Sequence, residues 1–185
     1  KKAGFLACHK FTFTEQFDML SQLEPGGTFL LNSPYSASEV WDHLPREVQQ
    51  QIIDKQAKFY VIDADAIARS VGLGGRINII MQAAFFNISG VLPEDQAMAM
   101  IEAAVEDTYG RKGSKVVEMN IKAAQVAIDR IERVNYPNKV TSTFSMRPPV
   151  PEDAPEFVKT VTAEIIAGRG DWLPVSKFPV DGTYP

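Results

Sequence analysis

The sequence predicts an α/β protein with a mostly parallel sheet and helices on both faces, followed by a helical segment and an extended, proline-rich C-terminal arm. Over the first half, short apolar runs alternate with helical patterns, which is the alternation that builds parallel sheets. Amphipathic helical patterns then dominate up to residue 134, and prolines recur from Asn135 onward. We therefore expect a domain over residues 1–134 and an arm over 135–185.

The overall composition narrows the functional classes. The chain has 185 residues, 45% of them hydrophobic, with a net charge of −4 and no basic block. This charge pattern argues against a nucleic-acid or membrane partner, and no apolar run is long enough to span a bilayer. The only cysteine, Cys8, cannot form an intrachain disulfide, and there is no cluster of metal ligands. The composition suits the cytoplasm.

The predicted elements begin with a buried strand over residues 4–8. Residues 14–23 carry one apolar face and predict a helix that ends at the Pro-Gly-Gly of residues 25–27. Residues 28–32 are continuously apolar, as expected for a strand covered on both faces.

Two helices and a third strand are predicted next. Ser36 or Ser38 can cap a short helix, and Pro45 tolerates the missing N–H at the start of a second one, which runs to about Lys55. Residues 58–62 form the third strand of the pattern.

The helix that follows is predicted to start at an Asp63 cap and to end at Val71. Residues 77–88 are apolar nearly all round and predict a buried helix, on which Asn78 and Gln82 share one stripe. These two either meet buried polar partners or face a cleft.

Two further helices are predicted before the arm. One runs from Pro93 to Tyr109, and the apolar stripe of another covers residues 117–131. The arm contains one predicted helix, at about residues 155–167, and its aromatic residues suggest that it packs on another surface.

The glycine stretch of residues 72–75 permits two interpretations. Gly72 can cap the preceding helix while Gly74 and Gly75 form a tight turn. Alternatively, the free N–H groups at the start of the next helix receive an anion. Arg76 suits a phosphate or carboxylate there, although an arginine paired with a neighbouring acid has the same sequence pattern.

Other candidate groups are few. Cys8 and His9 point to opposite faces of a strand, so they do not form a nucleophile and base. His43 is expected at the surface, and Asp63 and Asp65 are weak candidates at a strand end. The glycines match neither the phosphate loop nor the dinucleotide fingerprint.

Asn120 is another polar candidate, on the predicted helix over residues 117–131. It can present its amide to a ligand or bond to the backbone.

Several segments, taken in order, resemble the middle region of the single-chain pyruvate:ferredoxin (flavodoxin) oxidoreductases. The most specific is residues 71–86, which include Gly-Gly-Arg-Ile-Asn and Gln-Ala-Ala-Phe-Phe. The other matching segments are residues 5–9, 26–34, 90–93, 109–113, 119–120, 173–176 and 178–183.

This resemblance implies a fragment of an enzyme that oxidatively decarboxylates pyruvate to acetyl-CoA. Thiamine diphosphate, iron–sulfur clusters and coenzyme A would serve the whole enzyme, which is expected to be a homodimer, with ferredoxin or flavodoxin as electron acceptor. The fragment would correspond to the gamma subunit of multi-subunit relatives, with the arm leading to a ferredoxin-like domain. The glycine-rich turn that opens the family's domain would lie before Lys1.

The resemblance further implies that this segment closes the active site and helps position coenzyme A. We expect Gly74, Gly75, Arg76, Asn78 and Asn120 to bind substrate or coenzyme A, with no catalytic residue, no metal and no cofactor held by the fragment alone. The other domains of the same polypeptide would be its immediate partners. A non-catalytic scaffold and a free-standing coenzyme A or nucleotide-binding domain are the alternatives.

Overall fold

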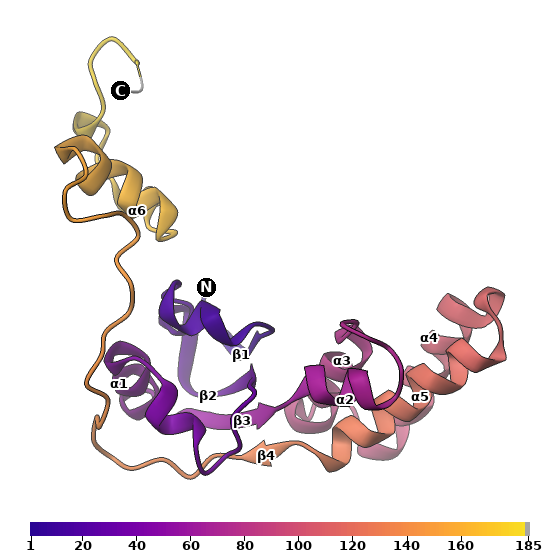
Figure 1. The fold of residues 1–185 in the computed structure, drawn as a ribbon. Helices are drawn as coiled ribbons and strands as arrows, with labels where there is room; N and C mark the ends of the chain where they lie inside the picture. Colours follow the sequence, from indigo (N-terminus) through magenta and orange to yellow (C-terminus); the bar gives the residue numbers. More distant parts are fainter. Residues whose placement is uncertain (184–185) are drawn as a thin grey trace.

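The computed structural model describes residues 1–183, except for the side chains of Glu94 and Asp95. Its sheet has four strands in the order β1 (Ala3–Cys8), β2 (Leu23–Asn32), β3 (Lys58–Ile62) and β4 (Glu132–Arg133) (Figure 1). The first three strands are parallel, and β4 joins β3 in the antiparallel direction. The predicted mostly parallel sheet is confirmed, and β4 is an addition that the sequence pattern did not predict.

Each face of the sheet supports its own hydrophobic core. On β2, Phe29 and Leu31 belong to one core and Leu30 to the other, as the alternation of side chains along a strand requires. The first core is completed by α1 (Arg46–Asp54), whereas the second includes residues of α2 (Ala64–Ser70). Helices therefore cover both faces, as predicted.

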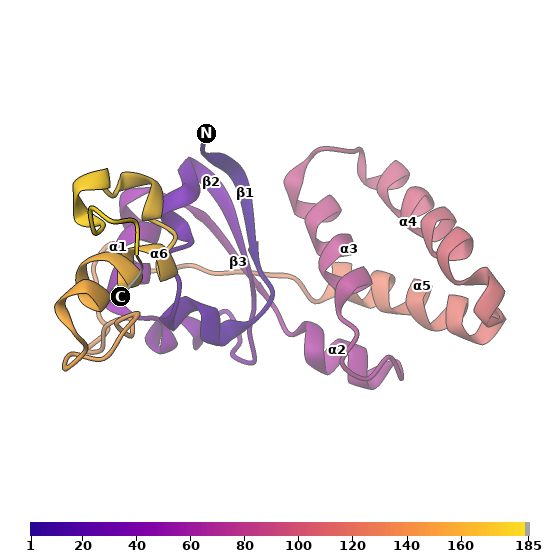
Figure 2. The same cartoon turned by 90° about the horizontal axis from the view of Figure 1, so that it is seen from above.

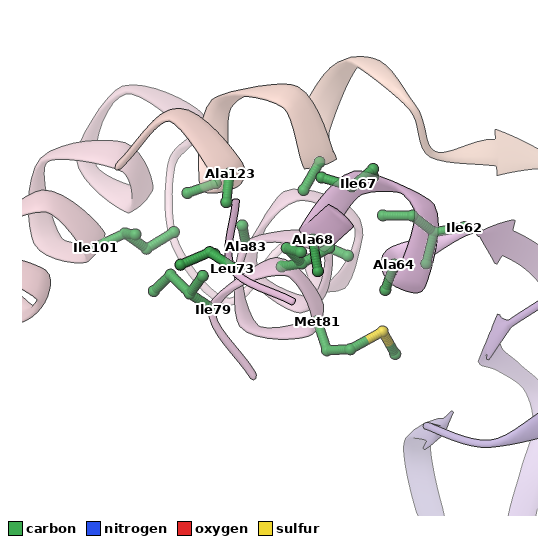
Figure 3. Packing of buried hydrophobic residues seen from close by; sticks show 14 of the residues in the cluster. Ile62, Ala64, Ile67, Ala68, Leu73, Ile79, Met81, Ala83, Ile101 and Ala123 are labelled. Carbon is green, nitrogen blue, oxygen red and sulfur yellow. The ribbon is translucent and has the colours of Figure 1, made fainter. Parts of the chain in front are cut away.

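Three long helices form a lobe beside the sheet (Figure 2). They are α3 (Asn78–Ser89), α4 (Glu94–Tyr109) and α5 (Ser114–Asp129), and α5 packs against both of the others. Leu73, just before α3, is buried among residues of α2, α3 and α5 (Figure 3). These helices follow the apolar periodicity of the sequence, so their prediction is confirmed.

The helix predicted over residues 14–23 is wrong. In its place there are short 3-10 turns at Phe11–Glu15 and Leu20–Gln22. The Thr14 hydroxyl donates to the carbonyl of Phe11 at 2.8 Å and the Ser21 hydroxyl to that of Asp18 at 2.9 Å, local bonds that compete with a regular helix.

The expected break at residues 25–27 is also wrong, because these residues lie inside β2. The pairing register with β1 shifts there, between the Ala3–Leu23 and Phe5–Thr28 pairs. The strand thus absorbs the glycines as an irregularity of its edge pairing rather than ending at them.

The short helix predicted after Ser36 or Ser38 is a 3-10 turn at Val40–His43. The Ser36 hydroxyl donates to the Glu39 carboxylate at 2.5 Å instead of capping a helix. This side-chain bond satisfies the serine locally and leaves only one tight turn before Leu44.

The extended arm runs along α1 and is fixed there by Gln49, whose side chain is fully buried. The Gln49 carbonyl oxygen accepts from the backbone N–H groups of Thr141 and Ser142, both at 2.9 Å, and its amide donates to the carbonyl of Trp41 at 2.6 Å. We call these contacts the Gln49 clamp. The first part of the arm is thus extended but held in one register.

Glu47 adds a pH-sensitive contact to the arm. Burial raises the pKa of its carboxyl, but hydrogen bonds from the Met146 N–H, from Ser145 and from its own backbone, together with Arg46, outweigh burial and lower the pKa. The contact is therefore complete at neutral pH and lost as pH falls through this lowered pKa. We expect the Met146 amide resonance to titrate with Glu47 in an acid NMR series. An unchanged resonance would contradict this contact.

The rest of the arm forms a small helical module away from the sheet (Figure 1). A π-helical turn at Val158–Thr162 leads into α6 (Ala163–Ile166), close to the predicted helix. Trp172 is 75% exposed and Val175 87% exposed, so neither finds cover among the described residues. Across those residues, no helix has the length and apolar character needed to cross a membrane.

Candidate functional site

The glycine stretch begins as the C-terminal cap of α2. Gly72 has a φ of +82°, and its N–H donates to the carbonyl of Arg69, while the N–H of Leu73 donates to that of Ala68 at 2.8 Å. This pair of bonds is the Schellman motif, in which the residue after the cap packs back on the helix. The capping role predicted for Gly72 is confirmed.

A tight turn then leads into α3. The N–H of Arg76 donates to the carbonyl of Leu73 at 3.3 Å, and Gly74 between them has a φ of +65°. The Arg76 side chain folds back so that its Nε donates to the same carbonyl at 3.1 Å. Arg76 is exposed, and among the described side chains it pairs with no acid.

The start of α3 also has open backbone donors. Ile77 occupies the cap position without a side-chain hydrogen bond to the first turn. Asn78 and Gln82 are both exposed, so neither meets a buried polar partner. A side chain added at Gly74 or Gly75 would meet nothing within 4 Å, so the backbone there is accessible. The surface has cationic and amide donors suited to an anion.

Helix α5 lies behind this surface. A Cβ at Gly72 would lie 3.8 Å from the sulfur of Met119, next to Asn120. Asn120 itself is 5% exposed, and its amide donates to the carbonyl of Val116 at 2.8 Å. The structure therefore brings the glycine stretch and this part of α5 together, with Asn120 bonded to its own helix.

A second polar site lies where β1, β2 and β3 end. A pocket of about 480 Å³ opens at this edge. Its lining residues are His9, Lys10, Phe11, Thr12, Asn32, Pro34, Asp63, Asp65 and Arg69. We call it the strand-end pocket. Asp63 also caps α2 as predicted, by accepting from the N–H of Ala66 at 2.8 Å.

Asn32 organises this edge of the sheet, although it was not among the residues expected to matter. Its amide donates to the carbonyl of His9 at 3.0 Å and to the Asp65 carboxylate at 2.9 Å, and its oxygen accepts from the N–H of Ala64 at 3.0 Å. One residue thus connects the ends of β1 and β2 with the start of α2. The sequence feature that could have indicated this role is the single amide side chain at the end of an apolar strand, just before Ser33 and Pro34.

The remaining candidates have structural or surface positions. Cys8 is buried, burial raises the pKa of its thiol despite a hydrogen bond to the backbone of Lys10, and the adjacent His9 is exposed. His43 is exposed and stacks on Tyr35, with ring centroids 3.6 Å apart. The described residues contain no group of three or more acidic, histidine or cysteine side chains that could hold a metal.

Residues 1–130 match the family model described as pyruvate ferredoxin/flavodoxin oxidoreductase. The chain belongs to this family. Residues 143–185 match a second model, described as a domain of unknown function. The expected resemblance is confirmed, and the two matched segments leave residues 131–142 between them, where the chain passes from β4 into the arm.

The similarity to relatives in this family extends over the whole chain. A putative pyruvate-flavodoxin oxidoreductase of Synechocystis is 49% identical over 185 residues, and a pyruvate-flavodoxin oxidoreductase of Rhodospirillum rubrum is 47% identical over 184. A pyruvate:ferredoxin oxidoreductase of Moorella thermoacetica is 41% identical over 184 residues. The chain spans only about 15% of the length of the first two relatives.

A solved structure shares the fold. The pyruvate oxidoreductase subunit PORC of Thermotoga maritima aligns with a TM-score of 0.56 at 17% identity, covering 72% of this chain and 66% of that subunit. At this identity the likeness supports the α/β architecture alone. It agrees with the sheet and helices described above.

Proposed function

We propose that this chain is a segment of an oxidoreductase that decarboxylates pyruvate oxidatively to acetyl-CoA and passes the electrons to ferredoxin or flavodoxin. The observation that carries the proposal is the similarity to the Synechocystis relative, 49% identical over the entire chain. Thiamine diphosphate would supply the decarboxylation chemistry and iron–sulfur clusters the electron path. The other domains of the same polypeptide would hold these groups, because this chain has one buried cysteine and cluster sites use several.

In this proposal the segment closes the active site and helps position coenzyme A. Gly74 and Gly75 leave room for an anionic group to approach the backbone, and the exposed Arg76 supplies a cation. Asn78 offers an exposed amide on the first turn of α3, where negative charge is favoured. Asn120 would support this surface from α5, next to Met119, whose sulfur lies near Gly72.

The immediate partners would be the neighbouring domains of the same polypeptide, in a cytoplasmic homodimer. The domain over residues 1–134 would face the active site, and the arm over 135–185 would lead to a ferredoxin-like domain. The exposed Trp172 and Val175 fit such a connection, since apolar side chains of this size are usually covered in the assembled protein.

A non-catalytic scaffold is the second candidate. It is favoured by one specific observation, the hydrogen bond from the Arg76 Nε to the carbonyl of Leu73, which gives the arginine a structural partner. A scaffold would need the same turn and the same helices. In a scaffold, however, replacing Arg76 would leave the coenzyme A dependence of the reaction unchanged.

The decisive experiment replaces Arg76 or Asn120 with alanine in the complete oxidoreductase. We expect Arg76→Ala to raise KM for coenzyme A by about tenfold, because a charged hydrogen bond is lost, while KM for pyruvate stays the same. We expect a smaller rise for Asn120→Ala, which acts through the position of α5. Arg111→Ala serves as the control, since Arg111 is exposed and lies in the 3-10 turn Gly110–Lys112 that follows α4.

If both variants keep the coenzyme A dependence of the unmodified enzyme, the scaffold is the correct interpretation. Calorimetric titration of coenzyme A into this chain alone tests the third possibility, a free-standing binding domain. Saturable heat in that titration would favour it over the proposal of a shared site.

A further inference from the structure

The strand-end pocket is separate from the surface proposed for coenzyme A positioning, and its lining falls into three chemical parts. Phe11 and Pro34 form an apolar wall. Asp63 and Asp65 contribute carboxylates, and Lys10 and Arg69 contribute cations. Its volume of about 480 Å³ lies within the ~300–1,000 Å³ typical of small-molecule sites.

The charged groups in this pocket have capacity left for a ligand. Each carboxylate uses one oxygen internally: Asp63 accepts from the N–H of Ala66 and Asp65 from the amide of Asn32. Within the described part of the chain, the guanidinium of Arg69 makes no hydrogen bond or ion pair. The ammonium of Lys10 lies 5.9 Å from the centroid of the Phe13 ring and has no acidic partner there.

The position of the pocket agrees with this chemistry. It opens at the carboxyl ends of three adjacent parallel strands, where ligands of α/β proteins bind. Asn32 is 4% exposed and holds Asp65 from beneath, so the carboxylate is oriented by the fold before any ligand arrives. Such preorganisation lowers the entropic cost of binding.

We propose that the strand-end pocket binds a phosphorylated nucleoside. The base packs against Phe11 and Pro34, the ribose hydroxyls donate to Asp63 and Asp65, and the phosphate accepts from Lys10 and Arg69. A simple anion would be repelled by the carboxylates of Asp63 and Asp65. An uncharged apolar ligand would leave the cations of Lys10 and Arg69 without a partner. The same chemistry is present in a free nucleotide and, if the proposed function holds, in the nucleotide portion of coenzyme A.

The test uses the complete oxidoreductase polypeptide and radiolabelled AMP in equilibrium dialysis, without turnover. We expect saturable binding that Arg69→Ala and Asp65→Asn each weaken by about tenfold, since each removes a charged hydrogen-bond partner. Asp65→Asn keeps an acceptor for Asn32, and Arg69 is exposed, so both variants should fold. Arg111→Ala, outside the pocket, should bind AMP as the unmodified enzyme does.

The KM for coenzyme A in the same variants separates the two sources. A parallel rise identifies the nucleotide portion of coenzyme A as the ligand, and an unchanged KM identifies a free nucleotide. AMP that does not bind, or that binds equally well to the pocket variants, overturns the proposal. Neither result bears on Arg76. The proposed function is tested separately, by the KM for coenzyme A in the Arg76 and Asn120 variants.

Discussion

Replacing Gln49 with leucine is expected to lower the free energy of unfolding by about 2–3 kcal/mol and to release the arm from α1. Leucine fills a similar volume but leaves the carbonyl of Trp41 and the N–H groups of Thr141 and Ser142 without their partner. A buried polar group that loses its hydrogen bond costs about 1–3 kcal/mol, although the arm groups regain part of this from water once they detach.

Urea unfolding measures the loss of stability, and limited trypsin digestion reports on the arm. Lys139 lies two residues before Thr141 in the Gln49 clamp and is followed by Val140, so trypsin cleavage after Lys139 should become faster in Gln49→Leu. Gln50→Leu is the matched control, because Gln50 is exposed and, within the described residues, its amide bonds only to Asp54. Equal digestion of both variants would show that the clamp does not hold the arm.

Replacing Asn32 with leucine is expected to cost about 3 kcal/mol of stability and to weaken AMP binding at the strand-end pocket. The change removes one donor group that serves His9 and Asp65 and one acceptor that serves the buried N–H of Ala64. Because the three partners belong to different segments, the loss also loosens the ends of β1 and β2 relative to α2.

Chemical unfolding followed by circular dichroism checks this value, and Asn138→Leu on the exposed arm is the control. A second variant, Asn32→Asp, keeps the acceptor for Ala64 but sets a carboxylate against Asp65. Like charges in contact raise the pKa of one of them, so this destabilisation should be largest at neutral pH and shrink as pH falls. If Asn32→Leu lowers the free energy of unfolding by less than about 0.5 kcal/mol, Asn32 does not organise this edge of the sheet.

The sequence predicted best where the pattern was long and periodic. The stripe of α5 and the nearly continuous apolar face of α3 are repeated over several turns, so each residue supports the same assignment. The strand at residues 28–32 was recognised for a similar reason, its continuous apolar character. The Asp63 cap was also predictable, because it depends on a hydrogen bond to a residue only three positions away.

Prediction failed where short-range alternatives compete. Residues 14–23 have an acceptable helical face, yet the hydroxyls of Thr14 and Ser21 bond to nearby carbonyls, and two 3-10 turns result. The glycines at residues 26–27 resembled a terminator but lie within β2, because pairing with β1 tolerates a register shift. Local side-chain bonds decided the first case, and pairing with the neighbouring strand decided the second.

The candidate site was partly predictable. Gly72 acts as the cap that its position before a new helix indicated, and the roles of Gly74, Gly75, Arg76, Asn78 and Asn120 in binding stay predictions. The strand-end pocket was only hinted at by Asp63 and Asp65. Its other members come from the ends of β1 and β2 and from α2, and no spacing in the chain connects them.

By itself the sequence determined the family, the alternation of strands and helices, and the capped turn at Gly72, because these depend on local pattern or on residues in a fixed order. The tertiary structure alone decided that Asn32 connects three chain segments and that Gln49 fixes the arm. Each of those side chains bonds to backbone groups far away in sequence, Asn32 to His9 and Ala64 and Gln49 to Thr141 and Ser142. Such bonds are specified by chain packing, which local sequence does not encode.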